Sequence, residues 1–228
     1  MANLIITIDG PAASGKSTAA RLLAKELGAS FLDTGAMYRA VTLAAMQAKV
    51  DMGDEAKLLD VIQTSDFQFT VRDDKMLVYV NGFDVTEKIR EPEVTANARY
   101  IASSPKARGK LVEMQRRFAT ERQKIVAEGR DQGTVAFCDA DVKFYLTADS
   151  AERARRRQAD LQAQGSNKSL EQIQKAIEER DKSDENRTIG PLRPAEDAIV
   201  VDTTGLGIEE VVEKLLDYVK EGPHFTKR

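Results

Sequence analysis

The chain has 228 residues, which is long enough for one large domain with a sizeable apolar core. Its formal net charge of −3 argues against a broad electrostatic surface for nucleic acid or a membrane. A single cysteine excludes an internal disulfide framework, and no stretch approaches the ~20 apolar residues of a membrane helix. Because no secretory signal is evident, we expect a cytoplasmic protein. The low aromatic content and the acidic surface favour a monomer.

A phosphate-binding motif lies close to the start of the chain. Leu4–Ile8 is an apolar run typical of a strand buried on both faces. Gly10–Ser17 fits the pattern G-x-x-x-x-G-K-[ST] at every fixed position. Thr18–Leu27 has the spacing of a helix, and Gly28 is placed to end it. Strand, glycine loop and helix therefore follow one another in the order that phosphate binding requires.

The chemistry of this loop predicts nucleotide binding. Backbone N–H groups at a helix N-terminus form a preorganised anion site, which the helix dipole strengthens. Lys16 would reach the β- and γ-phosphates, and the Ser17 hydroxyl would bind Mg²⁺. The alternative without function is a glycine turn that happens to precede Lys-Ser. Asp9 either touches the phosphate and Mg²⁺ cluster or merely ends the strand. We expect the ATP loop to comprise Gly10, Pro11, Ala12, Ala13, Ser14, Gly15, Lys16, Ser17 and Thr18.

Short apolar runs alternate with helical patterns along the rest of the chain, which predicts an α/β fold with a five-stranded parallel sheet flanked by helices. The expected strands are Leu4–Ile8, Phe31–Leu32, Ile125–Ala127, Val142–Leu146 and Ala198–Val201. Besides Thr18–Leu27, the expected helices are Ala36–Lys49, Glu93–Ala102, Pro105–Gln123, Ser150–Gln164, Ser169–Lys182 and Ile208–Lys220. We treat residues 1–228 as a single domain.

One region breaks this alternation. Between Asp66 and Val85 the sequence gives two alternating apolar runs separated by a charged turn, followed by Asn81-Gly82. This pattern predicts a small antiparallel insertion within residues 60–102, at the edge of the core. A second feature, Gln164–Lys168, has the composition of a loop tip between two charged helices.

Arginines and carboxylates gather where strands and helices are expected to end. In an open α/β sheet the carboxyl ends of the strands face the ligand crevice, so several of these groups should converge there. A phosphoryl acceptor that is an alcohol needs a base, whereas an acceptor that is itself a phosphate needs cations to screen the repulsion between anions. The excess of arginines over candidate bases favours the second. These arginines are Arg39, Arg130, Arg180 and Arg187, with Arg153, Arg156 and Arg157 in a later helix.

Several segments together resemble the bacterial cytidylate kinases, over nearly the whole chain. They are GPAASGKST, LDTGAMYRAVT, VAEGRDQGTVAF, ERARRR and ERDKSDENRTIGPLRPAEDAIVVDTT. The resemblance implies the nucleoside-monophosphate kinase fold, with a P-loop core, an acceptor region enlarged by an antiparallel sheet, and a helical lid over residues 150–185. It also implies phosphorylation of CMP and dCMP by ATP with Mg²⁺, as part of pyrimidine nucleotide metabolism.

The resemblance implies roles residue by residue. The base pocket would be read by Arg108 and Asp131, since a carboxylate accepts from the exocyclic amine of cytosine and an arginine donates to its ring acceptors. Two positions depart from the family: Arg99 stands where some members carry a serine that touches the base, through either a shifted alignment or a changed contact, and Glu128 stands where others carry Asp. The implied acceptor-binding residues are Thr34, Arg39, Arg108, Arg130, Asp131, Arg180, Asp184 and Arg187; the implied catalytic residues are Lys16, Arg130, Arg153, Arg157 and Arg187.

Other readings of the phosphate loop are weaker. A GTP-hydrolysing switch would explain D-x-x-G at Asp202–Gly205, but Asn167-Lys168 is followed by Leu170 where N-K-x-D needs an acid. A transporter-type ATPase lacks its L-S-G-G signature here. A kinase of the same fold acting on UMP, AMP or a small metabolite is the nearer alternative, and the G-R-D context argues against it by resemblance alone.

Overall fold

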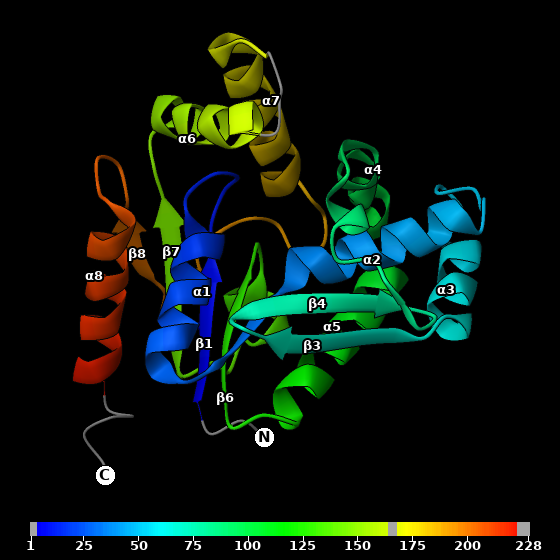
Figure 1. Cartoon of the computed structure of the whole chain (residues 1–228), viewed down its shortest axis with the longest axis horizontal. Coiled ribbons are helices and arrows are strands. Elements are labelled where there is room, and N and C mark those ends of the chain that lie inside the picture. The colour runs from blue at the N-terminus through cyan, green and yellow to red at the C-terminus, as the bar shows by residue number, and fades with distance from the viewer. Residues whose placement is uncertain (1–3, 164–167, 223–228) are drawn as a thin grey trace.

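The computed structural model describes residues 4–163 and 168–222. A central sheet of five parallel strands has the order β2-β6-β1-β7-β8 (Figure 1). The strands are β1 (Leu4–Asp9), β2 (Ser30–Asp33), β6 (Lys124–Gly129), β7 (Val142–Thr147) and β8 (Ile199–Asp202). This confirms the predicted α/β fold and its five-stranded parallel sheet.

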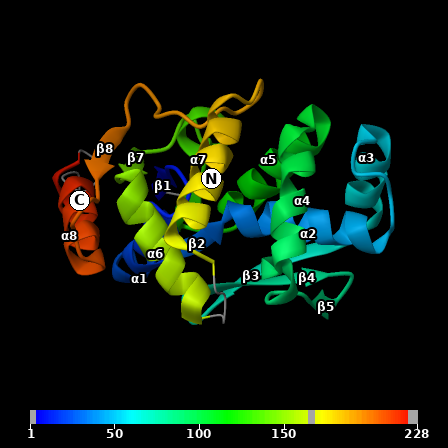
Figure 2. The same ribbon diagram turned by 90° about the horizontal axis from the view of Figure 1, so that it is seen from above.

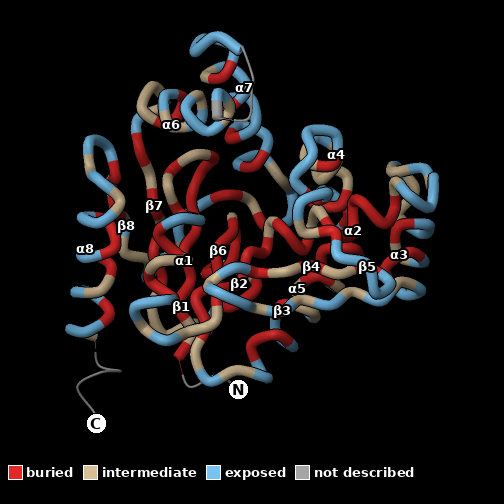
Figure 3. Tube along the Cα trace, in the orientation of Figure 1, coloured by how far each residue is buried: buried red, intermediate tan, exposed pale blue. Residues whose placement is uncertain are grey.

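Helices cover both faces of this sheet, and its strands are largely buried (Figure 3). The apolar side chains form two separate clusters, one on each face. On one face, Leu23 of α1 and Leu215 of α8 share a cluster with Ile6 and Ile8 of β1. On the other face, α2 and α5 pack over Ile125 and neighbouring side chains of the sheet. The helices are α1 (Lys16–Leu27), α2 (Thr34–Gln47), α3 (Glu55–Thr64), α4 (Pro92–Ser103), α5 (Pro105–Thr120), α6 (Ser150–Ala163), α7 (Leu170–Glu185) and α8 (Ile208–Glu221).

The predicted antiparallel insertion is confirmed as a three-stranded sheet. Its strands are β3 (Phe67–Arg72), β4 (Lys75–Val80) and β5 (Phe83–Asp84), in that order across the sheet. Val78 and Val80 of β4 are buried in the same cluster as α2, so the insertion packs on the α2 side of the molecule. In Figure 1 it lies next to α2 and α3, on the opposite side of the domain from the C-terminal helix α8.

Helix α3 was not expected from the sequence, although its signal is present. Asp54 caps the helix by accepting hydrogen bonds from the N–H groups of Ala56 and Lys57. Leu58, Val61 and Ile62 follow at helical spacing and are buried. A cap followed by an apolar stripe is sufficient to specify this helix.

Helices α6 and α7 pack side by side above the carboxyl ends of β1 and β7 (Figures 1 and 2). A small apolar cluster joins Ile173 and Ile177 of α7, Ala154 of α6 and Ala12 of the phosphate loop. Ser169 begins α7 with a capping box that uses Gln172. The predicted loop tip Gln164–Lys168 lies outside the described residues except for Lys168.

Two short turns complete the fold where the acceptor-side residues are expected. Lys88–Arg90 forms the 3₁₀ helix η1 before α4, and Gln132–Ala136 forms the π-helical turn η2 after β6. Neither was predicted, because a single turn has no apolar periodicity. Within the described ranges, no helix has the length and apolar character needed to cross a membrane.

Candidate functional site

The phosphate loop connects β1 to α1 in a backbone conformation that demands glycine. Gly10 has φ 152° and Gly15 has φ 84°. A Cβ at Gly10 would collide with the backbone carbonyl of Leu146, so the loop approaches β7 closely. In the part of the chain that the structure describes, no side chain caps the start of α1. Its first N–H groups are therefore directed at the space above the strand ends, as an anion site requires.

Lys16 lies within this loop and is almost fully buried. Its Nζ donates a hydrogen bond to the carbonyl of Pro11 at 3.0 Å. Burial lowers the pKa of Lys16, and the positive charge of Arg130 lowers it further. Bound phosphate would supply the missing negative charge, so this ammonium group is arranged to gain more from an anion than an exposed lysine would.

Ser17 and Glu128 form an oxygen-rich pair at the base of the loop. The Ser17 hydroxyl donates to Glu128 Oε1 at 2.9 Å. Burial raises the pKa of the Glu128 carboxyl group and the neighbouring Asp33 raises it further, while the charges of Lys16 and Arg130 oppose the shift. Hydroxyl and carboxylate oxygens are the ligands that Mg²⁺ prefers, and this ion takes few protein ligands alongside substrate phosphates. The residues present therefore fit a Mg²⁺ ion bound together with a triphosphate.

Strand register brings the end of β2 next to this pair, because Asp33 is paired with Glu128 in the sheet. Asp33 caps α2 by accepting from Ala36 N at 2.7 Å, and its other oxygen lies 3.3 Å from Arg39 Nη2 and 3.7 Å from Arg90 Nη2. The buried Nε of Arg39 has no hydrogen-bond partner among the described residues. Arg39 is therefore held in place by one carboxylate while part of its guanidinium stays available to an anion.

Thr34 of the D-T-G segment faces the same edge. Its hydroxyl donates to the carbonyl of Glu128 at 2.7 Å. The adjacent Gly129 has no room for a side chain, since a Cβ would lie 2.7 Å from Thr34 Oγ1. This contact fixes the start of α2 to the end of β6, and with it the position of Arg39 relative to Arg130.

Asp184 of α7 joins two of the predicted arginines. It accepts from Arg130 Nε at 2.9 Å and forms an ion pair with Arg187 through its other oxygen. Much of Arg180 is exposed, yet desolvation of its guanidinium and the charge of Arg130 lower its pKa to about 10. Two arginines therefore share one buried carboxylate and the charge of Arg180 lies near them, which favours the binding of an anionic substrate.

Arg108 and Asp131 form a buried ion pair next to the end of α4. Their side chains are 3% and 5% exposed, and Arg108 also donates to the carbonyl of Ala102 at 3.2 Å. The Arg108 guanidinium lies 5.6 Å from the centroid of the Tyr38 ring. Burial raises the pKa of Asp131, and the charge of Arg108 opposes this shift. The pair presents an acceptor and a donor in a desolvated setting, where a mismatched partner is costly.

Arg153 of α6 is attached to the phosphate loop. Its guanidinium donates to the carbonyls of Ala12 and Ala148, at 3.1 Å and 3.0 Å, and forms an ion pair with Asp181 of α7. Asp181 in turn accepts from Ala12 N at 3.0 Å. Both polar groups of the Ala12 backbone are therefore bound by side chains from the α6–α7 pair.

The two neighbouring arginines differ in exposure. Arg156 donates to the hydroxyl and the carbonyl of Thr203, at 3.0 Å and 2.6 Å, and lies beside Gly15. Arg157 is exposed on α6. The structure thus brings Lys16, Arg130, Arg187 and Arg153 to one edge of the sheet and leaves Arg157 on the surface of the α6–α7 pair above it.

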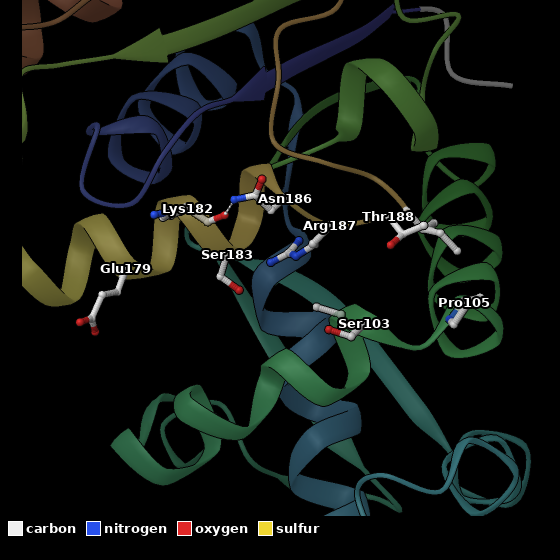
Figure 4. Close-up of a pocket in the computed structure, with 10 residues that line it drawn as sticks. Ser103, Pro105, Glu179, Lys182, Ser183, Asn186, Arg187 and Thr188 are labelled. Atoms are coloured by element: carbon white, nitrogen blue, oxygen red, sulfur yellow. Dashed lines mark hydrogen bonds between the residues drawn. The ribbon is translucent and has the colours of Figure 1, made fainter.

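A cleft of about 720 Å³ opens between α7 and the junction of α4 and α5. Arg187 and Ser183 face it from one side and Ser103 from the other (Figure 4). Its size is within the range typical of small-molecule sites. Arg187 lines the cleft and also binds Asp184, so it connects the cleft to the cluster of arginines.

Some residues of the site carry no motif that sequence reasoning could have used. Asp181 lies in the same E-R-D-x-x-D segment as Arg180 and Asp184. The sequence pattern does not distinguish a carboxylate that binds the phosphate loop from one on the surface. Arg90 belongs to a turn without periodicity. Arg99, whose register was uncertain, is exposed and donates to the Tyr100 hydroxyl at 3.3 Å.

The family model and the curated relatives identify one family. A family model described as cytidylate kinase matches residues 6–221. The chain is 48% identical over 218 residues to a cytidylate kinase of Rhodopirellula baltica, covering 96% of this chain and 93% of that one. It is 45% identical over 216 residues to one of Lactobacillus gasseri, covering 95% and 94%. Among solved structures, a gluconokinase of Sinorhizobium meliloti shares the fold with a TM-score of 0.51 at 13% identity, covering 99% and 98%.

Proposed function

The chain belongs to the cytidylate kinase family, and we propose from its site that it transfers the γ-phosphoryl group of ATP to CMP and dCMP. The products are ADP and CDP or dCDP. The observation that carries the choice of acceptor is the buried pair of Arg108 and Asp131, set between the phosphate-binding edge and helix α4.

This pair matches the hydrogen-bonding edge of cytosine. The exocyclic amine of the base donates, and the Asp131 carboxylate can accept. The ring N3 and O2 accept, and Arg108 can donate. Uracil presents a carbonyl where cytosine has its amine, so it would place two acceptors face to face in a site without water. A site built in this way rejects the wrong partner because its own buried polar group is left unpaired.

The acceptor phosphate is proposed to bind Arg39, Arg130 and Arg187, with Thr34 fixing the edge on which they lie. One oxygen of this phosphate attacks the γ-phosphorus in line, and the bond from that phosphorus to the bridging oxygen of ADP breaks. The arginines and Lys16 neutralise charge on the transferring group, which is the main task of a protein in phosphoryl transfer. Because the attacking oxygen already carries charge, no side chain needs to act as a base.

The nucleotide donor is proposed to bind Gly10–Thr18, with Mg²⁺ held at Ser17 and supported by Glu128. The ion, when bound, withdraws charge from the β- and γ-phosphates. Ser17 and Glu128 would orient the oxygens that receive it, and the hydrogen bond between them keeps both at the base of the loop.

Residues 150–185 are proposed to act as a lid and residues 60–102 as the acceptor-side insertion. The hydrogen bonds of Arg153 and Asp181 to Ala12 support the first assignment, because they connect α6 and α7 to the loop that holds the triphosphate. Arg153 and Arg157 are proposed to meet the transferring phosphate when the lid closes. Arg180 and Asp184 are proposed to contact the sugar of the acceptor, and the protein is proposed to act as a monomer.

The direct test measures ADP release from Mg-ATP with CMP, dCMP, UMP or AMP, and without an acceptor. We expect activity confined to the two cytidine nucleotides. ADP release without an acceptor, or with AMP alone, would keep the phosphate loop and overturn the acceptor assignment. A size-exclusion experiment with light scattering tests the monomer independently.

A further inference from the structure

Asp9 is a buried carboxylate at the carboxyl end of β1, immediately before the phosphate loop. It is 4% exposed. Its two oxygens accept from consecutive backbone N–H groups, Gln132 N at 2.9 Å and Gly133 N at 2.8 Å. The Asp9 side chain therefore has a structural role beyond the end of the strand. It does not bind the nucleotide loop but binds the segment that follows the neighbouring strand β6.

The bonded amides directly follow Asp131 and begin η2. Within η2, the carbonyl of Asp131 accepts from Val135 N at 2.9 Å, so the same residue is anchored on both sides. Free N–H groups at the start of a helical turn favour a negative charge, and buried N–H groups must find an acceptor. Asp9 meets both requirements with one side chain. The position of the Asp131 side chain then depends on a residue of β1 that is far away in the sequence.

We propose that Asp9 is a positioning residue for the acceptor base, and this rests on the proposed function of Arg108 and Asp131. By holding Gln132 and Gly133, Asp9 sets the direction in which Asp131 presents its carboxylate. Because Gly10 is the next residue in the chain, the same side chain fixes the distance between the ATP loop and the base pocket. Acceptor binding and base selectivity should therefore depend on a group that touches neither nucleotide.

The substitution Asp9→Asn separates this role from a general one in stability. Asn has the same shape, but its amide NH₂ would face a backbone N–H. At a pH above about 7, where Asp9 is ionised, one of the two amides therefore loses the acceptor that the carboxylate provides. We expect the KM for CMP to rise by about tenfold and the CMP-to-UMP ratio of kcat/KM to fall by about tenfold. The KM for ATP should change by less than about twofold, because the loop amides and Lys16 are untouched.

Asp141→Asn is the matched control. Asp141 accepts from Ile5 N at 2.7 Å, at the opposite end of the same strand. This variant also removes a carboxylate that accepts from the backbone of β1, and it should leave both the KM for CMP and the base ratio unchanged. The proposal is overturned if folded Asp9→Asn loses stability as the control does but keeps its KM for CMP and its base ratio.

A second variant covers the case in which Asp9→Asn does not fold. Asp9→Glu keeps the charge and lengthens the side chain by one methylene, which displaces residues 131–133, and the same split between the two KM values is expected. An unchanged KM for CMP in this variant also contradicts the proposal. Failure of the underlying function is recognised separately, since the unmodified protein would then show no preference for CMP over UMP.

Discussion

Asp131→Asn is the substitution that tests the base pocket most directly. The change keeps the volume of the side chain but removes its charge. Asp131 is paired with Arg108, whose side chain is 3% exposed, so the variant leaves a buried guanidinium without its counter-charge. Breaking one side of a buried ion pair in this way costs about 3–5 kcal/mol of folding stability.

The effect on selectivity is distinct from the effect on stability. In the unmodified pocket, uracil leaves the carboxylate facing a carbonyl, at a cost of about 1–3 kcal/mol or more. Asn can turn its amide to donate to that carbonyl, so this penalty is removed. A difference of 1–3 kcal/mol corresponds to a factor of roughly 5 to 150. We therefore expect the CMP-to-UMP ratio of kcat/KM to fall by a factor in this range, mainly through a gain of activity on UMP.

The assay compares initial rates of ADP formation with CMP and UMP at saturating Mg-ATP, at a temperature well below the unfolding midpoint of the variant. Asp139→Asn is a suitable control, because Asp139 lies a few residues further along the chain and is exposed. A folded Asp131→Asn protein with an unchanged CMP-to-UMP ratio would refute the base-reading role of Asp131.

Three further substitutions test other parts of the site. Lys16→Met should lower turnover by roughly 100- to 1000-fold while the Kd for CMP stays the same, since the lysine interacts with the donor phosphates alone; unchanged turnover would exclude its role. Glu128→Gln should raise the Mg²⁺ concentration for half-maximal activity by about tenfold, because it weakens the oxygen pair formed with Ser17, and a Mg²⁺ titration that superimposes on the unmodified one would contradict this. Asp181→Asn should lower the free energy of unfolding by about 3–5 kcal/mol because Arg153 loses its buried partner, and urea denaturation measures the loss.

The sequence was sufficient for the sheet and for the donor loop because both depend on local signals. Short, β-branched apolar runs such as Leu4–Ile8 favour buried strands, and the glycines of the loop are required by its own backbone. The antiparallel insertion was equally local, since alternation and turn residues specify a hairpin without reference to the rest of the chain. These features were predictable from neighbouring residues alone.

Contacts between distant segments were not predictable in this way. Asp9 binds amides more than a hundred positions along the chain, and Asp181 binds Ala12 across a similar separation. In both cases the residues next to the carboxylate in the sequence do not reveal which group it binds. Resemblance supplied the substrate-side arginines, but the side chains that orient them became visible only when the strands were placed in register.

The buried carboxylate of Asp9 also predicts how stability depends on pH. Burial raises its pKa from the ordinary 3.8 to about 7, although the hydrogen bonds from Gly133 and Gln132 oppose the shift. Between these two values the folded protein keeps a proton on Asp9 that the unfolded chain has released. The contribution of this group is therefore most favourable at low pH and becomes steadily less so as the pH rises towards about 7.

Comparing the protein with Asp9→Asn isolates this contribution, because the other titrating groups are present in both. Each pKa unit corresponds to about 1.4 kcal/mol, so the free energy of unfolding of the unmodified protein, relative to the variant, should fall by about 3 kcal/mol between pH 5 and pH 8 and level off above pH 7. Guanidinium denaturation at a series of pH values measures this difference. A difference that does not change with pH would mean that Asp9 is already ionised at pH 5, in which case the two backbone amides outweigh its burial.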